Sequence, residues 1–201
     1  FSVTGLAERN KVLHKATMQA GDVLILTKPL GTGTIFAADM RAKAKGRWVD
    51  NTIASMLQSN RAAGNCLHAY DANACTDVTG FGLIGHLLEM LDRSSLTATL
   101  NLDALPVLDG AVETSGLGIL SSLHPKNELL ARRLSAGEVR DQHPGFPMLF
   151  DPQTAGGLLA SISNAQASTC IERLRELGYT DASVIGSVRP RANNEQPIII
   201  K

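Results

Sequence analysis

The sequence predicts a compact domain of the α+β or α/β class, in which a β-sheet is mixed with helices. Residues 23–27 are a continuous apolar run of strand length, as in a strand covered on both faces. Residues 96–102 alternate apolar and polar side chains, as in a strand with two unlike faces. Residues 83–92 carry leucines four positions apart, which is typical of one face of a helix.

Composition limits the classes of function. The chain has 201 residues, 44% hydrophobic and 19% charged, which is enough to bury a core. Its 19 basic residues balance 19 acidic ones, so we expect neither nucleic acid nor an anionic membrane surface as a partner. No apolar run approaches the roughly 20 residues of a membrane span, and the N-terminus lacks a secretory signal pattern. We therefore expect a cytoplasmic protein.

Three cysteines occur at wide spacing, Cys66, Cys75 and Cys170. An odd number without a CxxC pair indicates neither a disulfide framework nor a cysteine metal site. We expect reduced thiols.

In the first half of the chain, turn residues separate the expected elements. Gly46 and Gly64 are expected to end two helices, and the second helix is expected to turn Ile53, Met56, Leu57 and Asn60 to one side. The expected elements are a strand at 23–27, a helix at 35–45 with Thr34 as N-cap, a helix at 51–63 with Asp50 as N-cap, a strand at 74–78, a helix at 83–92 and a strand at 96–102.

The second half is harder to interpret between residues 105 and 147, where the pattern indicates only short helices at 107–114 and 127–134 with long loops. The remaining expected elements are strand pieces at 148–150 and 157–162, a turn at 151–154, a helix at 165–177 with Cys170, Ile171, Leu174 and Leu177 inward, and strands at 184–188 and 198–200.

Asp77 is the first candidate for a functional residue, because it ends an apolar strand just before a glycine-lined entry to a helix. A carboxylate in this place is suited to Mg²⁺, which prefers oxygen ligands and is often shared with substrate phosphates. Gly80 and Gly82 would let an anion approach the backbone at the start of the helix. Spacing alone, however, favours the alternative that Asp77 only caps the turn.

Residues 31–34, Gly-Thr-Gly-Thr, could also cradle a phosphate. They lack the Gly-Lys-Ser/Thr ending of a P-loop and the GxGxxG of a dinucleotide fold, so a plain strand-to-helix connection is favoured. Lys28 could reach a phosphate there, although a solvated lysine at a strand end is the more ordinary outcome.

His86 and the segment 151–157 are two further candidates. His86 could act as an acid or base, but a histidine without a partner at ligand or triad spacing is more often a surface or packing residue. The segment 151–157 is rich in polar groups, and Pro152 with its glycines favours a sharp turn. No Ser-His-Asp, Cys-His or paired-carboxylate pattern is legible.

Residue identity says more than spacing in three segments. They read LTKPLGTG at 26–33, ACTDVTGFGLIGHL at 74–87 and FDPQTAGGLLA at 150–160. Together and in this order, they resemble the motifs of the selenophosphate synthetase (selenide, water dikinase) family, and the similarity runs from about residue 21 to the C-terminus. Other ATP-using enzymes of the same superfamily carry different residues around the glycines.

The resemblance implies an α+β, three-layer α/β/α domain with a mixed sheet, like the C-terminal domain of aminoimidazole ribonucleotide synthetase. Residues 21–201 would form this domain, and residues 1–20 would be a linker from a missing N-terminal domain. The family converts selenide, ATP and water to selenophosphate, AMP and phosphate with Mg²⁺. By the resemblance, Asp77 is a magnesium ligand at the ATP phosphates, and Thr79, Gly80 and Gly82 are candidates for the phosphate loop.

The resemblance places the catalytic cysteine or selenocysteine in the missing domain, so no catalytic residue is expected in this chain and the isolated chain is expected to be inactive. The full-length protein is expected to be a homodimer. Two departures stand out: Ala155 replaces the usual serine, and residues 121–127 replace a stretch that commonly reads Gly-Gly-Thr-x-Arg-Asn. The alternatives are a stand-alone binding module with the same fold and another ATP-using enzyme of the superfamily.

Overall fold

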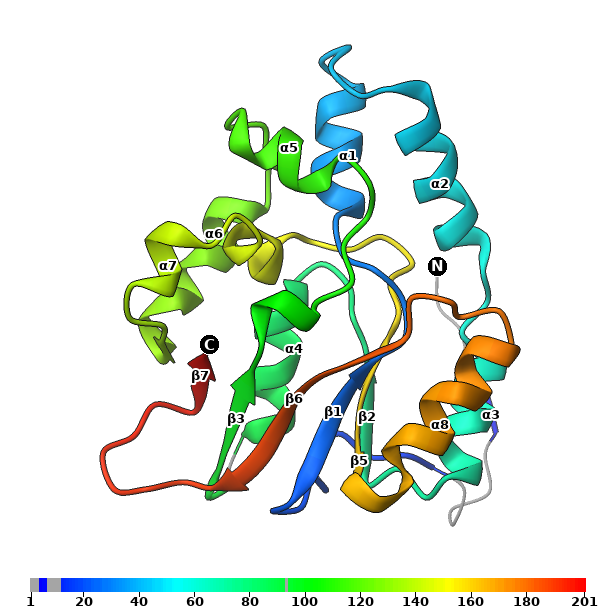
Figure 1. Cartoon of the computed structure of the whole chain (residues 1–201), viewed down its shortest axis with the longest axis vertical. Coiled ribbons are helices and arrows are strands. Elements are labelled where there is room, and N and C mark those ends of the chain that lie inside the picture. The colour runs from blue at the N-terminus through cyan, green and yellow to red at the C-terminus, as the bar shows by residue number, and fades with distance from the viewer. Residues whose placement is uncertain (1–3, 7–11, 93) are drawn as a thin grey trace.

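The computed structural model describes residues 4–6, 12–92 and 94–201. In this part of the chain a mixed sheet of seven strands has the order β2-β5-β1-β6-β3-β7-β4 (Figure 1). Its β3–β7 and β4–β7 pairs are parallel and the other pairs are antiparallel. The strands are β1 Asp22–Leu26, β2 Ala74–Asp77, β3 Leu96–Leu100, β4 Leu134–Ser135, β5 Leu158–Ser163, β6 Ser183–Pro190 and β7 Ile198–Ile200.

Helices cover both faces of the sheet. Helices α3 (Arg61–Ala69) and α8 (Asn164–Glu176) lie on one face, and α4 (Gly82–Leu91) lies on the other (Figure 1). Strand β1 is buried throughout, and its side chains alternate between the two cores. Leu24 packs in the core that contains α4, and Ile25 packs in the core that contains α3 and α8. The predicted α+β class and the three-layer arrangement are confirmed.

The remaining helices gather beyond the end of the sheet toward which β1 runs (Figure 1). They are α1 Thr32–Asp39, α2 Gly46–Leu57, α5 Ala111–Gly116, α6 His124–Glu128 and α7 Val139–Gln142, with 3₁₀ turns at Leu102–Ala104, Leu129–Arg133 and Phe146–Phe150. All expected strands except 148–150 are found within two residues of the predicted bounds. The same holds for the expected helices 83–92 and 165–177.

The predicted helix 35–45 is wrong at both ends. Helix α1 begins at Thr32, because Gly31 takes the left-handed φ of +123° that closes the turn before it. Thr34, expected to be the N-cap, lies inside the helix. The helix ends at Asp39, and Gly46, expected to end it, begins α2.

The predicted helix 51–63 is also wrong, since it is two helices. Helix α2 ends at Leu57, Gln58 is extended, and α3 follows with Gly64 inside it. The side of α2 that carries Ile53 and Leu57 is not its buried side, since these residues are 41% and 80% exposed. Trp48 and Thr52 are the buried residues of α2, because Trp48 packs on Gly110 in front of α5.

The interpretation of 105–150 needs three corrections. Helix α5 begins only at Ala111, after Gly110 at a φ of +83°, and not at 107. The expected helix 127–134 is the end of α6 followed by a 3₁₀ turn. The expected strand at 148–150 is part of the 3₁₀ turn Phe146–Phe150. Pro147 is tolerated near the start of this turn, and the other side chains of the turn are buried.

The N-terminal segment contacts the sheet before β1 begins. Residues 1–3 and 7–11 of the predicted linker lie outside the described residues. In the rest of it, Met18 lies in the core, and the His14 carbonyl accepts a hydrogen bond from the Cys75 N–H at 3.0 Å.

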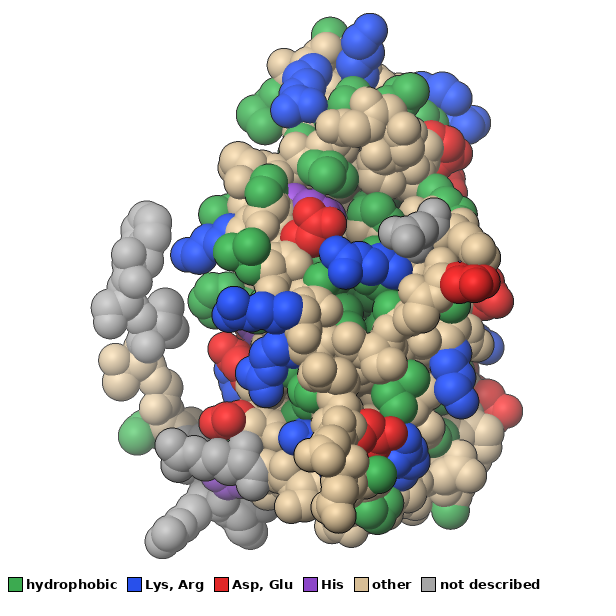
Figure 2. Space-filling model, turned by 90° about the vertical axis from the view of Figure 1, so that its left-hand side faces the viewer, with side chains coloured by type: hydrophobic (Ala, Val, Ile, Leu, Met, Phe, Trp, Pro, Cys, Tyr) green, Lys and Arg blue, Asp and Glu red, His purple; other side chains and the backbone are tan. Residues whose placement is uncertain are grey.

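The surface seen in Figure 2 carries Lys and Arg side chains interspersed with Asp and Glu, without a continuous patch of one sign. Among the described residues no helix has the length and apolar character needed to cross a membrane. The three cysteines are free thiols, as predicted.

Candidate functional site

The three motifs meet where β1 and β2 end and the antiparallel β5 begins. Strand β5 pairs with both neighbours, so that Leu158 lies opposite Asp77 and Leu159 lies opposite both Leu26 and Thr76. The Thr27 N–H donates to the Leu158 carbonyl at 3.0 Å, and the Val78 N–H donates to Gly157 at 2.9 Å. The segment 151–157, which precedes β5, is therefore held between the loops that follow β1 and β2.

Asp151 closes the N-terminus of α1. Its buried carboxylate accepts hydrogen bonds from the Gly33 N–H at 3.1 Å, the Thr34 hydroxyl at 2.8 Å and the Gln153 side-chain amide at 3.0 Å. Burial raises the pKa of Asp151 to about 6, against the opposing effect of these hydrogen bonds. A carboxylate at this position is favoured by the unpaired N–H groups and the dipole of the helix.

Gln153 occupies the rest of the same helix end. Its Oε1 lies 3.1 Å from the Gly31 nitrogen, 3.3 Å from the Thr32 nitrogen and 3.2 Å from the Thr32 hydroxyl, each of which donates to it. The Thr32 hydroxyl in turn accepts from the Thr154 N–H at 2.9 Å. The amides that a phosphate would need are used within the protein, so the structure favours a plain strand-to-helix connection at 31–34.

Lys28 fits neither of its predicted roles. It is 2% exposed, and its Nζ donates to the carbonyls of Gln58 at 2.6 Å and Ala155 at 3.1 Å. Burial lowers the pKa of its ammonium group. The lysine is thus an internal link between β1, the end of α2 and the 151–157 segment. Residue 157 has to be a glycine for the two segments to approach this closely, since a Cβ there would lie 2.6 Å from the Lys28 backbone nitrogen.

Asp77 is different, because its side chain is exposed at the end of β2. The described residues hold no group of three or more His, Cys, Asp or Glu side chains that could bind a metal. A single exposed carboxylate still fits Mg²⁺, which is commonly bound by one or two carboxylates together with substrate phosphates. A complete set of ligands at Asp77 would therefore include groups from a substrate or from outside the described residues.

Thr79, Gly80 and Gly82, in the loop after Asp77, differ in their contacts. The Thr79 N–H and hydroxyl both contact His86. Gly82 has a φ of +68°, and a Cβ there would lie 2.9 Å from the Phe150 carbonyl carbon, so packing explains this glycine. Gly80 differs, since an added Cβ would meet nothing within 4 Å. Of the two glycines, only Gly80 leaves open space in which an anion could approach the backbone.

Asn127 is a site residue that the interpretation of the sequence missed. Its Nδ2 donates to the carbonyls of Gly80 at 2.9 Å and Phe150 at 3.0 Å, and it joins α6 to the loop after β2. The available signal was the asparagine that ends the related family stretch, which residues 121–127 retain at their last position.

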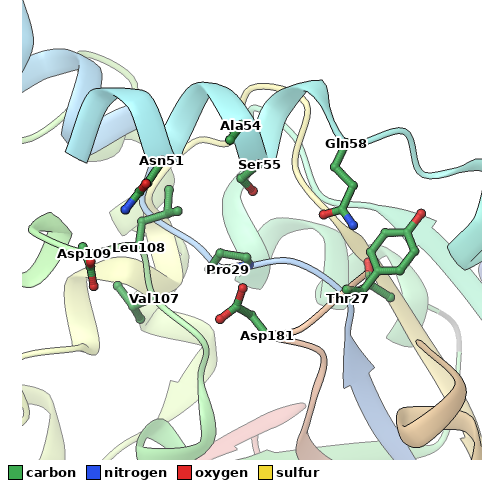
Figure 3. A pocket seen from close by; sticks show the side chains of 11 residues that line it. Thr27, Pro29, Asn51, Ala54, Ser55, Gln58, Val107, Leu108, Asp109 and Asp181 are labelled. Carbon is green, nitrogen blue, oxygen red and sulfur yellow. The ribbon is translucent and has the colours of Figure 1, made fainter. Parts of the chain in front are cut away.

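A separate hollow of about 370 Å³ lies under α2 (Figure 3). Helix α2 contributes Asn51, Ala54 and Ser55, and Gln58 follows directly after it. The Asp181 carboxylate points into the hollow from the opposite side. The other lining residues are Thr27, Pro29, Val107, Leu108, Asp109 and Tyr179. Among the described lining residues there are two carboxylates and no Lys or Arg, which disfavours a phosphate ligand there.

Sequence comparison assigns the chain to a family. The model of the AIR synthase related protein, C-terminal domain, matches residues 19–195. The chain belongs to this family. The selenide, water dikinase of Clostridioides difficile is 35% identical over 195 residues, covering 95% of this chain and 55% of that protein. The selenide, water dikinase of Trichlorobacter lovleyi is 38% identical over 201 residues, covering 100% and 57%. The chain thus spans about half the length of these relatives.

Several solved structures share the fold of this chain. The hydrogenase maturation protein HypE of E. coli has a TM-score of 0.67 at 17% identity, over 94% of this chain and 48% of that one. The thiamine-monophosphate kinase of Stenotrophomonas maltophilia has a TM-score of 0.60 at 18% identity, over 97% and 54%. At these identities the likeness concerns the fold alone.

The first prediction concerns Asp151. Replacing it by alanine leaves the Gly33 N–H and the Thr34 hydroxyl without their acceptor, so Asp151→Ala should lower the free energy of unfolding by about 3 kcal/mol. Urea denaturation measures this. The exposed Asp50→Ala on α2 is the control and should change stability little. Equal stability of the two variants would contradict the capping role.

The second prediction separates the two glycines. Gly82→Ala should cost about 2 kcal/mol or more, because alanine is strained at this φ and meets the Phe150 backbone. Gly80→Ala should stay within about 0.5 kcal/mol of the unchanged protein. Thermal and urea denaturation of both variants provide the measurement, and a comparable loss in Gly80→Ala would refute the distinction.

Proposed function

We propose that this chain is the C-terminal part of a selenide, water dikinase, an ATP-dependent enzyme that makes selenophosphate from selenide, ATP and water, with AMP and phosphate as the other products. The observation that carries the proposal is the similarity to proteins of that name over 95% to 100% of the chain. Since the chain spans about half of those relatives, a further domain, which we place N-terminal to residues 21–201, would complete the enzyme.

In this proposal Asp77 is a magnesium ligand, and the bound Mg²⁺ would neutralise charge on the ATP phosphates, the main aid that phosphoryl transfer needs. The exposure of Asp77 at the end of β2 supports this role. The open space at Gly80 supports it as the place where the loop meets a phosphate, with Thr79 beside it. The nucleophile, and with it the catalytic step, would belong to the further domain.

The buried polar residues of the site hold its loops in place. Asp151 and Gln153 hold the 151–157 segment against α1, and Lys28 holds its Ala155 end. Asn127 holds Gly80 from α6. The chain's contribution would thus be one metal ligand on a loop that is fastened on both sides.

A second candidate is another ATP-using enzyme with this fold. It is favoured by two solved structures whose names record the nucleotide: a HypE in complex with ATP and a thiamine monophosphate kinase complexed with AMPPCP and TMP. Both are at most 16% identical to this chain, so the dikinases remain the better guide. A homodimer and a cytoplasmic location stay predictions.

The test is Asp77→Asn in the longer protein that carries this chain. Loss of one magnesium ligand should lower selenophosphate formation about 100-fold or more, since even outer partners of metal ligands are worth 10- to 100-fold. Formation of selenophosphate from selenide and ATP is followed by ³¹P NMR.

The matched control is Asp109→Asn, an exposed carboxylate of the hollow under α2, which should leave the rate unchanged. The 201-residue chain by itself should make no selenophosphate. Normal activity of Asp77→Asn would overturn the metal assignment. Turnover of an aminoimidazole precursor or of thiamine phosphate, without turnover of selenide, would favour the second candidate.

A further inference from the structure

His86 is a buried histidine that contacts the loop carrying Asp77. It is 4% exposed, and its Nε2 lies 3.0 Å from the Thr79 backbone nitrogen and 3.1 Å from the Thr79 hydroxyl oxygen. A backbone N–H can only donate a hydrogen bond. The Nε2 atom must therefore be the acceptor, which requires that it carries no proton.

The other ring nitrogen then carries the proton of the neutral ring. Nδ1 is buried and lies 3.5 Å from the Glu89 Oε2. Among the described residues it has no partner with the geometry of a hydrogen bond. Glu89 also accepts from the Lys15 ammonium at 3.0 Å. The second nitrogen therefore faces a carboxylate, and this contact favours the tautomer that leaves Nε2 free to accept.

The contact matters because of where it falls in the loop. The Thr79 carbonyl accepts from the Gly82 and Gln153 N–H groups, each at 3.0 Å, and the Gly80 carbonyl accepts from Asn127. These bonds fix the far side of the loop. On the side of Asp77, the Val78 N–H donates to the Gly157 carbonyl at 2.9 Å, and the Thr79 N–H, two residues after Asp77, donates to His86 at 3.0 Å.

We propose that neutral His86 is a positioning residue, which fixes the Asp77–Gly82 loop by accepting the Thr79 N–H and thereby sets the direction of the Asp77 carboxylate. The part that concerns Asp77 rests on the proposed function. The part that concerns the loop does not. His86 touches no reacting atom in this proposal, and it acts through Thr79.

The bond has a pH dependence that a purely packing role would lack. The charged groups facing the ring are Glu89 on α4, Asp77 on β2 and Lys15 from the N-terminal segment. Burial lowers the pKa of His86 and outweighs Glu89 and Asp77, which raise it. In the unfolded chain the ring has its ordinary pKa of about 6.5. The stabilisation is therefore complete above that pH and is lost as the pH falls through the lower pKa of the folded state.

The experiment is ¹⁵N NMR of the 201-residue chain with His86→Gln and His86→Leu. In the unchanged chain the ring should show an unprotonated Nε2 at pH 7 and titrate below the ordinary histidine pKa. The Thr79 amide should exchange with solvent at least 10-fold faster in His86→Leu. In His86→Gln the side-chain oxygen can accept the same N–H, so protection should be largely restored.

His124→Leu is the matched control. His124 is equally buried and its Nδ1 also lacks a partner, but its ring packs edge-on against Phe150 and not on Thr79. This variant should lower stability without changing exchange at Thr79. A protonated Nε2 at pH 7, or equal exchange at Thr79 in His86→Leu and the unchanged chain, would overturn the proposal. If His86→Leu does not fold, the tautomer and the titration of the unchanged chain decide.

Mn²⁺ separates this inference from the proposed function. Added Mn²⁺ should broaden the Asp77 signals of the unchanged chain. The broadening should be weaker in His86→Leu and should return in His86→Gln. Absence of broadening in all three, with the Thr79 result intact, would remove the Asp77 assignment and leave the loop-positioning role standing. Broadening that is equal in all three would overturn the positioning of Asp77 by His86 and leave the metal assignment standing.

Discussion

The contact on which the other parts of the site depend is a buried carboxylate at the end of a helix. Asp151 and its neighbour Gln153 satisfy the first N–H groups of α1, and this fixes the path of the chain from the 3₁₀ turn at Phe146–Phe150 into β5. That path in turn decides where Phe150 lies, and Gly82 has to pass against the Phe150 backbone. The loop behind Asp77 is therefore shaped by a contact on the opposite side of β5.

Charges inside this region are met by backbone dipoles. Asp151 is met by an N–H group and by neutral side chains, and Lys28 is met by two carbonyl groups. Neither has an ion pair as its main partner in the described part of the chain. Such partners hold their positions with the backbone, so the arrangement is rigid without long, flexible charged side chains. Asp77 differs from both, because it is an exposed carboxylate.

The sequence pattern was sufficient for six of the seven described strands and for α4 and α8, because their apolar periodicity is strong and each packs directly on a core. It missed the short strand β4. It failed where backbone geometry decides. Gly31 moved the start of α1, and the extended Gln58 split one expected helix into two, with α2 burying Trp48 in place of Ile53. In the site, residue identity indicated the three segments that the fold brings together. The partners of Lys28 and Asn127, and those of the Gln153 oxygen, come from segments 23 to 127 positions away, which no local pattern contains.

The two glycines of the loop after Asp77 have different consequences for how this family can diverge. Gly82 is demanded by its own φ and by the Phe150 backbone, so it should persist in any relative that keeps the fold, whatever that relative does. Gly80 has no such internal demand. On the function proposed above, its retention together with Asp77 would mark the relatives that bind a phosphate here, and its drift would mark those that kept only the scaffold.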